Sequence, residues 1–134
     1  MKFKDPVVED RFKDLNPQAQ KIAIEMDQWA MEKYKIELTI TATVSTLEED
    51  KLLKRQSDTH RTRRAWDVRT RDLPDEFIAE LISYFNKKYA NKFGAIVGGE
   101  PSLIVYRPHG TGPHLHIQLN RKYALKELTY GKEN

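Results

Sequence analysis

The chain has 134 residues, of which 39% are hydrophobic and 32% are charged, and it includes two Trp, six Tyr and five Phe. This length suits one domain, and the composition supplies enough apolar surface for a core, which excludes an intrinsically disordered chain. Because cysteine is absent, disulfides, cysteine-based zinc fingers and thiol nucleophiles are excluded. Any bound metal must therefore be held by His, Asp or Glu. We predict a single domain over residues 1–134.

No segment is typical of a secretion signal or a membrane span. Residues 1–6 contain no apolar run, and no stretch approaches the roughly 18 uncharged apolar residues that cross a bilayer. We therefore expect a protein that is made in the cytoplasm without a signal peptide, has no membrane partner and is monomeric.

The charge is nearly balanced overall but uneven along the chain. Twenty-three Lys and Arg against twenty Asp and Glu give a net charge of +3, which alone does not predict a nucleic-acid partner. Residues 54–71 carry the local excess, which either forms a solvated loop or attracts carboxylates or phosphates. Its basic residues are Lys54, Arg55, Arg61, Arg63, Arg64, Arg69 and Arg71. A nucleic-acid-binding protein stays an alternative that we do not expect, because Trp66 is the single aromatic residue interleaved with these charges.

The pattern of the first half predicts two helices and a strand. In residues 17–35, apolar side chains recur at the i, i+4 and i+7 spacing of one helix face, after Asn16 as a candidate N-cap. In residues 36–45, apolar and hydroxyl side chains alternate, as on a half-buried strand. A short helix over residues 47–54 follows, with acidic residues in its first turn.

The second half predicts one long helix and several short strands. Residues 65–70 form a brief strand, and a helix opens near Asp72 and Pro74 and stops near Gly94. Three further strands are expected over residues 93–97, 103–106 and 114–119, with turn-rich segments between them. This order predicts an α+β fold in which helices pack on one face of a small, mainly antiparallel sheet.

The four histidines lie in or beside polar segments at strand edges. They are His60, His109, His114 and His116. Residues two apart on a strand project to the same face, so His114 and His116 present both imidazoles to one side. Asp67 lies on the strand that follows the loop holding His60. Three such nitrogen and oxygen donors with an open fourth position form a catalytic zinc site. The alternative is that the strand histidines face solvent and the aspartate pairs with a neighbouring arginine.

Two segments resemble those of a known enzyme family. Residues 60–67, HRTRRAWD, resemble the H-x-x-G-x-A-x-D segment of zinc peptidases that cut peptidoglycan, the D-Ala-D-Ala carboxypeptidase and L-alanyl-D-glutamate endopeptidase family. Residues 113–117, PHLHI, resemble the strand that carries the last ligand, in the H-x-H form also found in lysostaphin-type and murein endopeptidases and hedgehog signalling domains. With residues 38–50, which resemble the strand and turn before the first ligand, the likeness covers roughly residues 38–119. It implies an α+β fold.

The resemblance also implies a zinc ion held by His60, Asp67 and His116, with water or substrate in the fourth position. One departure concerns the general base. Members of the family with a glutamate base place it three or four residues before the last ligand or before the H-x-H, where this chain has Pro113 and Gly110.

Other residues are therefore expected to complete the site. His114, the first histidine of H-x-H, would act as the general base, because imidazole takes up a proton near neutral pH. His109, in the preceding loop, is the candidate hydrogen-bond donor to the oxyanion. Arg61 and Arg63 are expected to bind a substrate carboxylate, and Tyr106 is expected to line the cleft.

These expectations define a zinc-dependent metallopeptidase that hydrolyses peptide bonds in peptidoglycan stems or cross-links. The absence of a signal fits a phage endolysin that acts on the cell wall after release, or a lysin carried in the virion. A catalytically inactive zinc-binding phage structural or recognition module is the main alternative, since the usual glutamate is missing.

Overall fold

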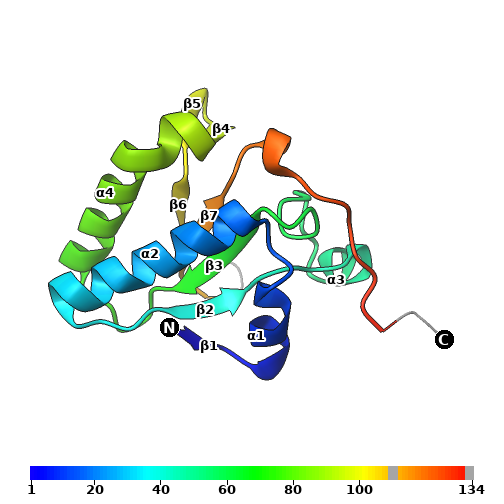
Figure 1. Ribbon diagram of the computed structural model, residues 1–134, viewed down its shortest axis with the longest axis horizontal. Coiled ribbons are helices and arrows are strands. Elements are labelled where there is room, and N and C mark those ends of the chain that lie inside the picture. Colours follow the sequence, from blue (N-terminus) through cyan, green and yellow to red (C-terminus); the bar gives the residue numbers. More distant parts are fainter. Residues whose placement is uncertain (109–111, 132–134) are drawn as a thin grey trace.

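The computed structural model describes residues 1–108 and 112–131, which fold into an α+β domain with a mainly antiparallel sheet (Figure 1). This confirms the predicted fold class. The helices of this part of the chain are α1 (Pro6–Phe12), α2 (Pro17–Tyr34), α3 (Leu47–Leu52) and α4 (Asp75–Phe93), with a 3₁₀ turn at Arg121–Tyr123. The strands are β1 (Lys2–Phe3), β2 (Thr39–Ala42), β3 (Ala65–Arg69), β4 (Ala95–Val97), β5 (Glu100–Ser102), β6 (Ile104–Arg107) and β7 (His114–Gln118).

The main sheet has the strand order β1-β2-β3-β7-β6. β1 pairs with β2 in parallel, and the other neighbours are antiparallel. β4 and β5 form a separate two-stranded sheet. β3 is therefore the central strand, hydrogen-bonded on both sides.

The long helices begin and end where the sequence provides signals. Asn16 caps α2 by accepting a hydrogen bond from the backbone N–H of Gln18 at 2.7 Å, and Pro17 occupies the first turn. α2 ends at Lys35, which adopts a left-handed conformation with a φ of 57°. α4 ends before Gly94, as predicted from the sequence.

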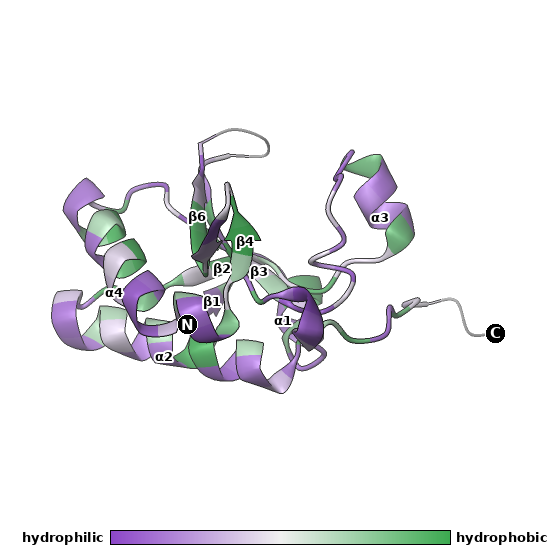
Figure 2. Cartoon of the chain, turned by 90° about the horizontal axis from the view of Figure 1, so that it is seen from above, coloured by the Kyte–Doolittle hydropathy of each residue, from purple (hydrophilic) through white to green (hydrophobic). Residues whose placement is uncertain are grey.

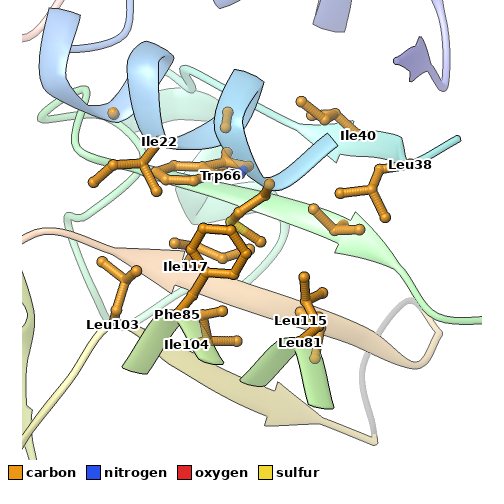
Figure 3. Packing of buried hydrophobic residues seen from close by; sticks show 14 of the residues in the cluster. Ile22, Leu38, Ile40, Trp66, Leu81, Phe85, Leu103, Ile104, Leu115 and Ile117 are labelled. Carbon is orange, nitrogen blue, oxygen red and sulfur yellow. The ribbon is translucent and has the colours of Figure 1, made fainter. Parts of the chain in front are cut away.

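Both long helices cover the same face of the sheet, as predicted. Figure 3 shows Ile22 of α2 and Phe85 of α4 packed around Trp66 and Ile117 of the two central strands. Trp66 is fully buried, and burying a side chain of this size contributes about 2–3 kcal/mol or more to folding. Because strand residues alternate between faces, the neighbour of Trp66 on β3, Asp67, points to the opposite face.

The N-terminal region and β2 differ from the predicted elements. The strand expected over residues 36–45 ends at Ala42, because its pairing with β3 shifts between Ile40 and Ala42. The chain then leaves the sheet, and the Thr43 hydroxyl donates to the carbonyl of Val8 in α1 at 2.9 Å. β1, α1 and β5 were not predicted from the sequence.

Within the described residues, no helix is both long enough and apolar enough to cross a membrane.

Candidate metal centre

The register of the sheet collects polar side chains on the face opposite the helices. Asp67 on β3 lies directly across from His116 on β7. His114 on β7 lies between Arg69 on β3 and Arg107 on β6. Directly opposed residues of antiparallel strands project to the same face, so these five side chains share one surface.

The structure brings together the three residues that the resemblance implied as metal ligands. His60 Nε2 lies 3.2 Å from Asp67 Oδ1, and His116 Nδ1 lies 2.9 Å from the same oxygen. One candidate ligand atom from each residue lies within 4.8 Å of the others, and all three residues are buried. This group can hold a metal ion.

The orientation of His60 is set by a backbone carbonyl. His60 Nδ1 lies 2.8 Å from the carbonyl oxygen of Thr43, in the segment that follows β2. A carbonyl can only accept a hydrogen bond, so Nδ1 carries the proton and Nε2 of a neutral ring carries a lone pair. That lone pair faces the Asp67 carboxylate. Histidines that bind metals commonly donate their second N–H in this way.

The ring of His116 has its outer nitrogen among polar side chains. His116 Nε2 lies 3.0 Å from Gln118 Oε1 and 3.4 Å from the Thr59 hydroxyl. An N–H at Nε2 can donate to Gln118, which leaves Nδ1 as the nitrogen facing Asp67. The two histidines therefore offer different ring nitrogens to the shared point, Nε2 of His60 and Nδ1 of His116.

The electrostatics of the group favour a cation. Burial alone would raise the pKa of Asp67, but the charges of His60 and His116 and their hydrogen bonds outweigh burial and lower the pKa far below its ordinary value. A buried carboxylate that stays ionised needs positive charge close by. Either protonated imidazoles or a metal ion can supply it, and a proton or a metal ion on Nε2 of His60 also removes the repulsion between its lone pair and the carboxylate.

His114 lies at the rim of this group, and one of its ring nitrogens faces Asp67. Its Nδ1 lies 2.8 Å from the carbonyl oxygen of Gly112 and therefore carries the proton. Its Nε2 lies 3.8 Å from Asp67 Oδ2. In the neutral ring this nitrogen is an acceptor at the edge of the candidate metal site. The predicted oxyanion donor, His109, lies outside the described residues.

The loop that carries His60 is fixed by a buried carboxylate. Asp50 of α3 accepts hydrogen bonds from Ser45 at 2.7 Å and from Arg55 and Arg61 at 3.0 Å each. Burial alone would raise the pKa of Asp50, but these hydrogen bonds outweigh burial and lower it. α3 itself begins in a capping box between Thr46 and Glu49.

The structure does not bring the two predicted substrate-binding arginines to the candidate site. Arg61 pairs with Asp50 and lies 3.5 Å from Glu127. Arg63, which has a φ of 66°, donates to the carbonyl oxygens of Asp14 at 2.7 Å and Lys126 at 3.1 Å. Both guanidinium groups therefore hold the loop against other parts of the chain.

Tyr106 also lies away from the site. It pairs with Leu115 across β6 and β7, and Leu115 is buried in the core under the helices. Tyr106 therefore projects to the helix-covered side of the sheet. Arg107, the next residue, projects to the side of the histidines and lines their cavity.

The cluster opens into two adjoining cavities with basic walls. A cavity of about 160 Å³ contains the three clustered residues and His114, and a second of about 310 Å³ lies beside it, sharing Arg55, Asp67 and His114. We call the larger one the basic cavity. Its basic lining residues are Lys4, Arg55, Arg69 and Arg71. Among the described residues that line either cavity, Asp67 is the single carboxylate.

The sequence analysis included Arg55, Arg69 and Arg71 in the basic excess of residues 54–71 but did not assign them to the site, and it missed Lys4. A signal existed for Arg69, because it lies two residues after Asp67 on the same strand and so shares its face. The basic excess was the signal for Arg55, and no signal existed for Lys4, which only the folding of the chain brings to the cavity. Searches against family models, curated proteins and solved structures find no match for this chain. The resemblance to the peptidoglycan peptidases therefore stays a prediction.

Removing any one of the three clustered residues should weaken metal binding strongly. We expect about one zinc ion per chain in the wild type and at least about 100-fold weaker binding in His60→Ala, Asp67→Ala and His116→Ala. Zinc at about 1,000 times its Kd should stabilise the wild type by about 4 kcal/mol. Elemental analysis and thermal unfolding measure both effects. His114→Ala is the matched control and should keep its zinc. Loss of zinc in His114→Ala together with retention of zinc in His116→Ala would contradict the proposed ligand set.

Asp50 should make the stability of the protein depend on pH. The folded-state pKa of Asp50 is lowered, so its contribution is fully present above the unfolded pKa of about 3.9 and is lost as the pH falls through the folded value. Asp50→Asn should cost about 2 kcal/mol at pH 7, because Arg55 and Arg61 lose their partner but keep some solvent contact. The difference from wild type should shrink below about pH 4, as measured by urea unfolding. A difference independent of pH would contradict this role.

Proposed function

We propose that this protein is a zinc-dependent peptidase that hydrolyses acidic peptides, with peptidoglycan stem peptides as the substrate class. The observation that supports this most directly is the buried group of His60, Asp67 and His116, with Nε2 of His114 at its edge, 3.8 Å from Asp67 Oδ2. Two neutral histidines and a carboxylate form a ligand set that zinc accepts, and three protein ligands leave a position open for catalysis. Such an enzyme would act on the cell wall, as phage lysins do.

The chemistry follows from the arrangement of these groups. A divalent cation held there supplies Lewis-acid polarisation of the scissile carbonyl and makes water more acidic. His114 Nε2 accepts the proton of the attacking water and then returns it to the leaving amine, which is general base and general acid catalysis by one imidazole. The hydrogen bond between Nδ1 and the Gly112 carbonyl keeps the ring oriented for both steps.

The walls of the cleft favour an anionic substrate. Lys4, Arg69 and Arg71 are exposed, and none of them forms an ion pair with another residue in the part of the chain that the structure describes. Cationic side chains that converge on a cavity attract carboxylates and raise their local concentration. Stem peptides carry such carboxylates, so these residues take the role that the sequence suggested for Arg61 and Arg63.

A second candidate function is a metal-binding recognition module without activity. It is favoured by the absence of any carboxylate other than Asp67 among the described residues lining the two cavities, because a glutamate base is the more usual proton acceptor in zinc peptidases. The two functions differ in the role of His114, which is catalytic in the first and dispensable in the second.

Hydrolysis by the zinc-loaded protein tests the proposal. We expect the wild type to release new amino groups from purified peptidoglycan or from synthetic stem peptides. His114→Ala should keep its zinc and lose about 10²- to 10⁴-fold in kcat, because the proton acceptor is removed. The assay is the rate of amine release together with the metal content of each variant.

Tyr106→Ala is the matched control, because this residue is exposed on the neighbouring strand but lies on the other face of the sheet. It should keep wild-type activity. A wild type that is fully loaded with zinc and cleaves neither substrate would rule out the peptidase and leave the recognition module.

A further inference from the structure

A third cavity lies next to the basic cavity and has a different character. It has a volume of about 350 Å³ and lies between α1 and α3, over the end of β2. Figure 2 shows α3 standing away from α1, with hydrophobic stretches along it. We call this space the apolar cavity. Its aliphatic lining residues are Val7, Val8, Ala42, Val44, Leu52 and Leu53.

The two leucines at the end of α3 are unusually exposed. Leu52 has 83% and Leu53 has 51% of its surface accessible to solvent. Val7, on the α1 side of the cavity, is 55% exposed. Contiguous exposed aliphatic side chains around a concavity are typical of a binding site, because leaving them in water costs free energy that a ligand can recover.

The charged side chains that line the apolar cavity already have partners. Arg11 pairs with Glu49 at 2.8 Å, and Asp5 accepts the backbone N–H of Val8 at 2.9 Å. The charged side chain at its inner end, Arg55, is held by Asp50. A charged ligand would have to displace one of these partners, so the cavity selects an uncharged, aliphatic group.

The apolar cavity is continuous with the candidate active site. It shares Thr41, Ala42, Leu53 and Arg55 with the basic cavity, and Arg55 also lines the cavity of the histidine cluster. The carbonyl that orients His60 belongs to Thr43, which lines the apolar cavity. The cavity of the histidine cluster, the basic cavity and the apolar cavity therefore adjoin one another. We call the three together the trough.

We propose that the apolar cavity binds an aliphatic side chain of the peptide substrate, separated from the scissile bond by an acidic residue. This inference rests on the proposed peptidase function and specifies its substrate class. The shared lining residues give the order of the groups. The basic cavity shares Asp67 and His114 with the cavity of the histidine cluster and four residues with the apolar cavity, whereas the apolar cavity and the cavity of the histidine cluster share Arg55 alone among the described residues. The enzyme therefore prefers a peptide that is acidic near the cleaved bond and aliphatic further along.

Binding of matched peptides tests this inference. The probes are pairs of blocked, glycine-rich peptides that contain one Glu and have either Leu or Gly two or three residues to either side of it. Zinc-loaded His114→Ala protein binds them without cleavage, and isothermal titration calorimetry gives Kd. We expect the best Leu peptide to bind about tenfold more tightly than its Gly partner.

The preference should depend on the two exposed leucines. In a Leu52→Ser/Leu53→Ser background the Leu and Gly peptides should bind within about twofold of each other. Ile96→Ser is the matched control, because Ile96 is 67% exposed on β4, outside the trough, and it should leave the preference unchanged. Metal content and thermal unfolding verify that each variant keeps its fold.

The possible outcomes distinguish failure of the proposed apolar subsite from failure of the proposed peptidase function. Equal binding of Leu and Gly peptides by protein whose wild type cleaves acidic peptides would overturn the apolar subsite and leave the peptidase. A Leu preference that survives in the double variant would also overturn it, since another surface would then hold the side chain. No binding of any probe would overturn the inference, and the hydrolysis assay on peptidoglycan and stem peptides decides the proposed peptidase separately.

Discussion

One ionised carboxylate, Asp67, is buried on the central strand of the sheet and must be matched by positive charge. Burying an unpaired carboxylate costs several kcal/mol, and the fold meets this cost by directing imidazoles from a loop and from the neighbouring strand at it. The Thr43 carbonyl orients His60 toward the carboxylate, and the register of β7 places His116 beside it. A divalent cation bound between the three side chains would supply the positive charge, and so would protonation of the imidazoles.

One face of β3 contributes to the hydrophobic core, and the other contributes to the candidate metal site and its cavities. Trp66 and Val68 project into the core under α2 and α4, while Asp67 and Arg69 project into the cleft. A change in the register of this strand by one residue would exchange the faces and destroy the core and the site together. Stability and function are thus coupled in five residues, and binding of a cation to the folded state adds to the stability of the same strand.

Alternation along the strands allowed much of the fold and part of the site to be predicted from the sequence. The apolar stripes located α2 and α4, and the spacing of His114 and His116 placed both rings on one face. The family resemblance grouped His60 with Asp67. The sequence could not show that β7 pairs with β3, since that register depends on contacts between residues 49 positions apart. The pairing is what brings His116 to Asp67.

The residues that line the cavities were harder to predict, because arginines serve several physical roles. Arg61, Arg63 and Arg64 lie nearest to His60 in sequence, but the loop needs them to satisfy Asp50, backbone carbonyls and Asp58. The arginines that line the cleft come from both sides of this cluster along the chain. Proximity in sequence to a metal ligand was therefore a poor guide, whereas the two-residue periodicity of β3 would have indicated Arg69.

The position of the metal tests the central claim most directly. A crystal of the zinc-loaded protein, measured at the zinc absorption edge, should show one strong anomalous peak about 2.0–2.2 Å from His60 Nε2, His116 Nδ1 and an Asp67 oxygen. A zinc ion bound elsewhere, or no peak at this point while the three side chains keep their ion pairs, would contradict the account.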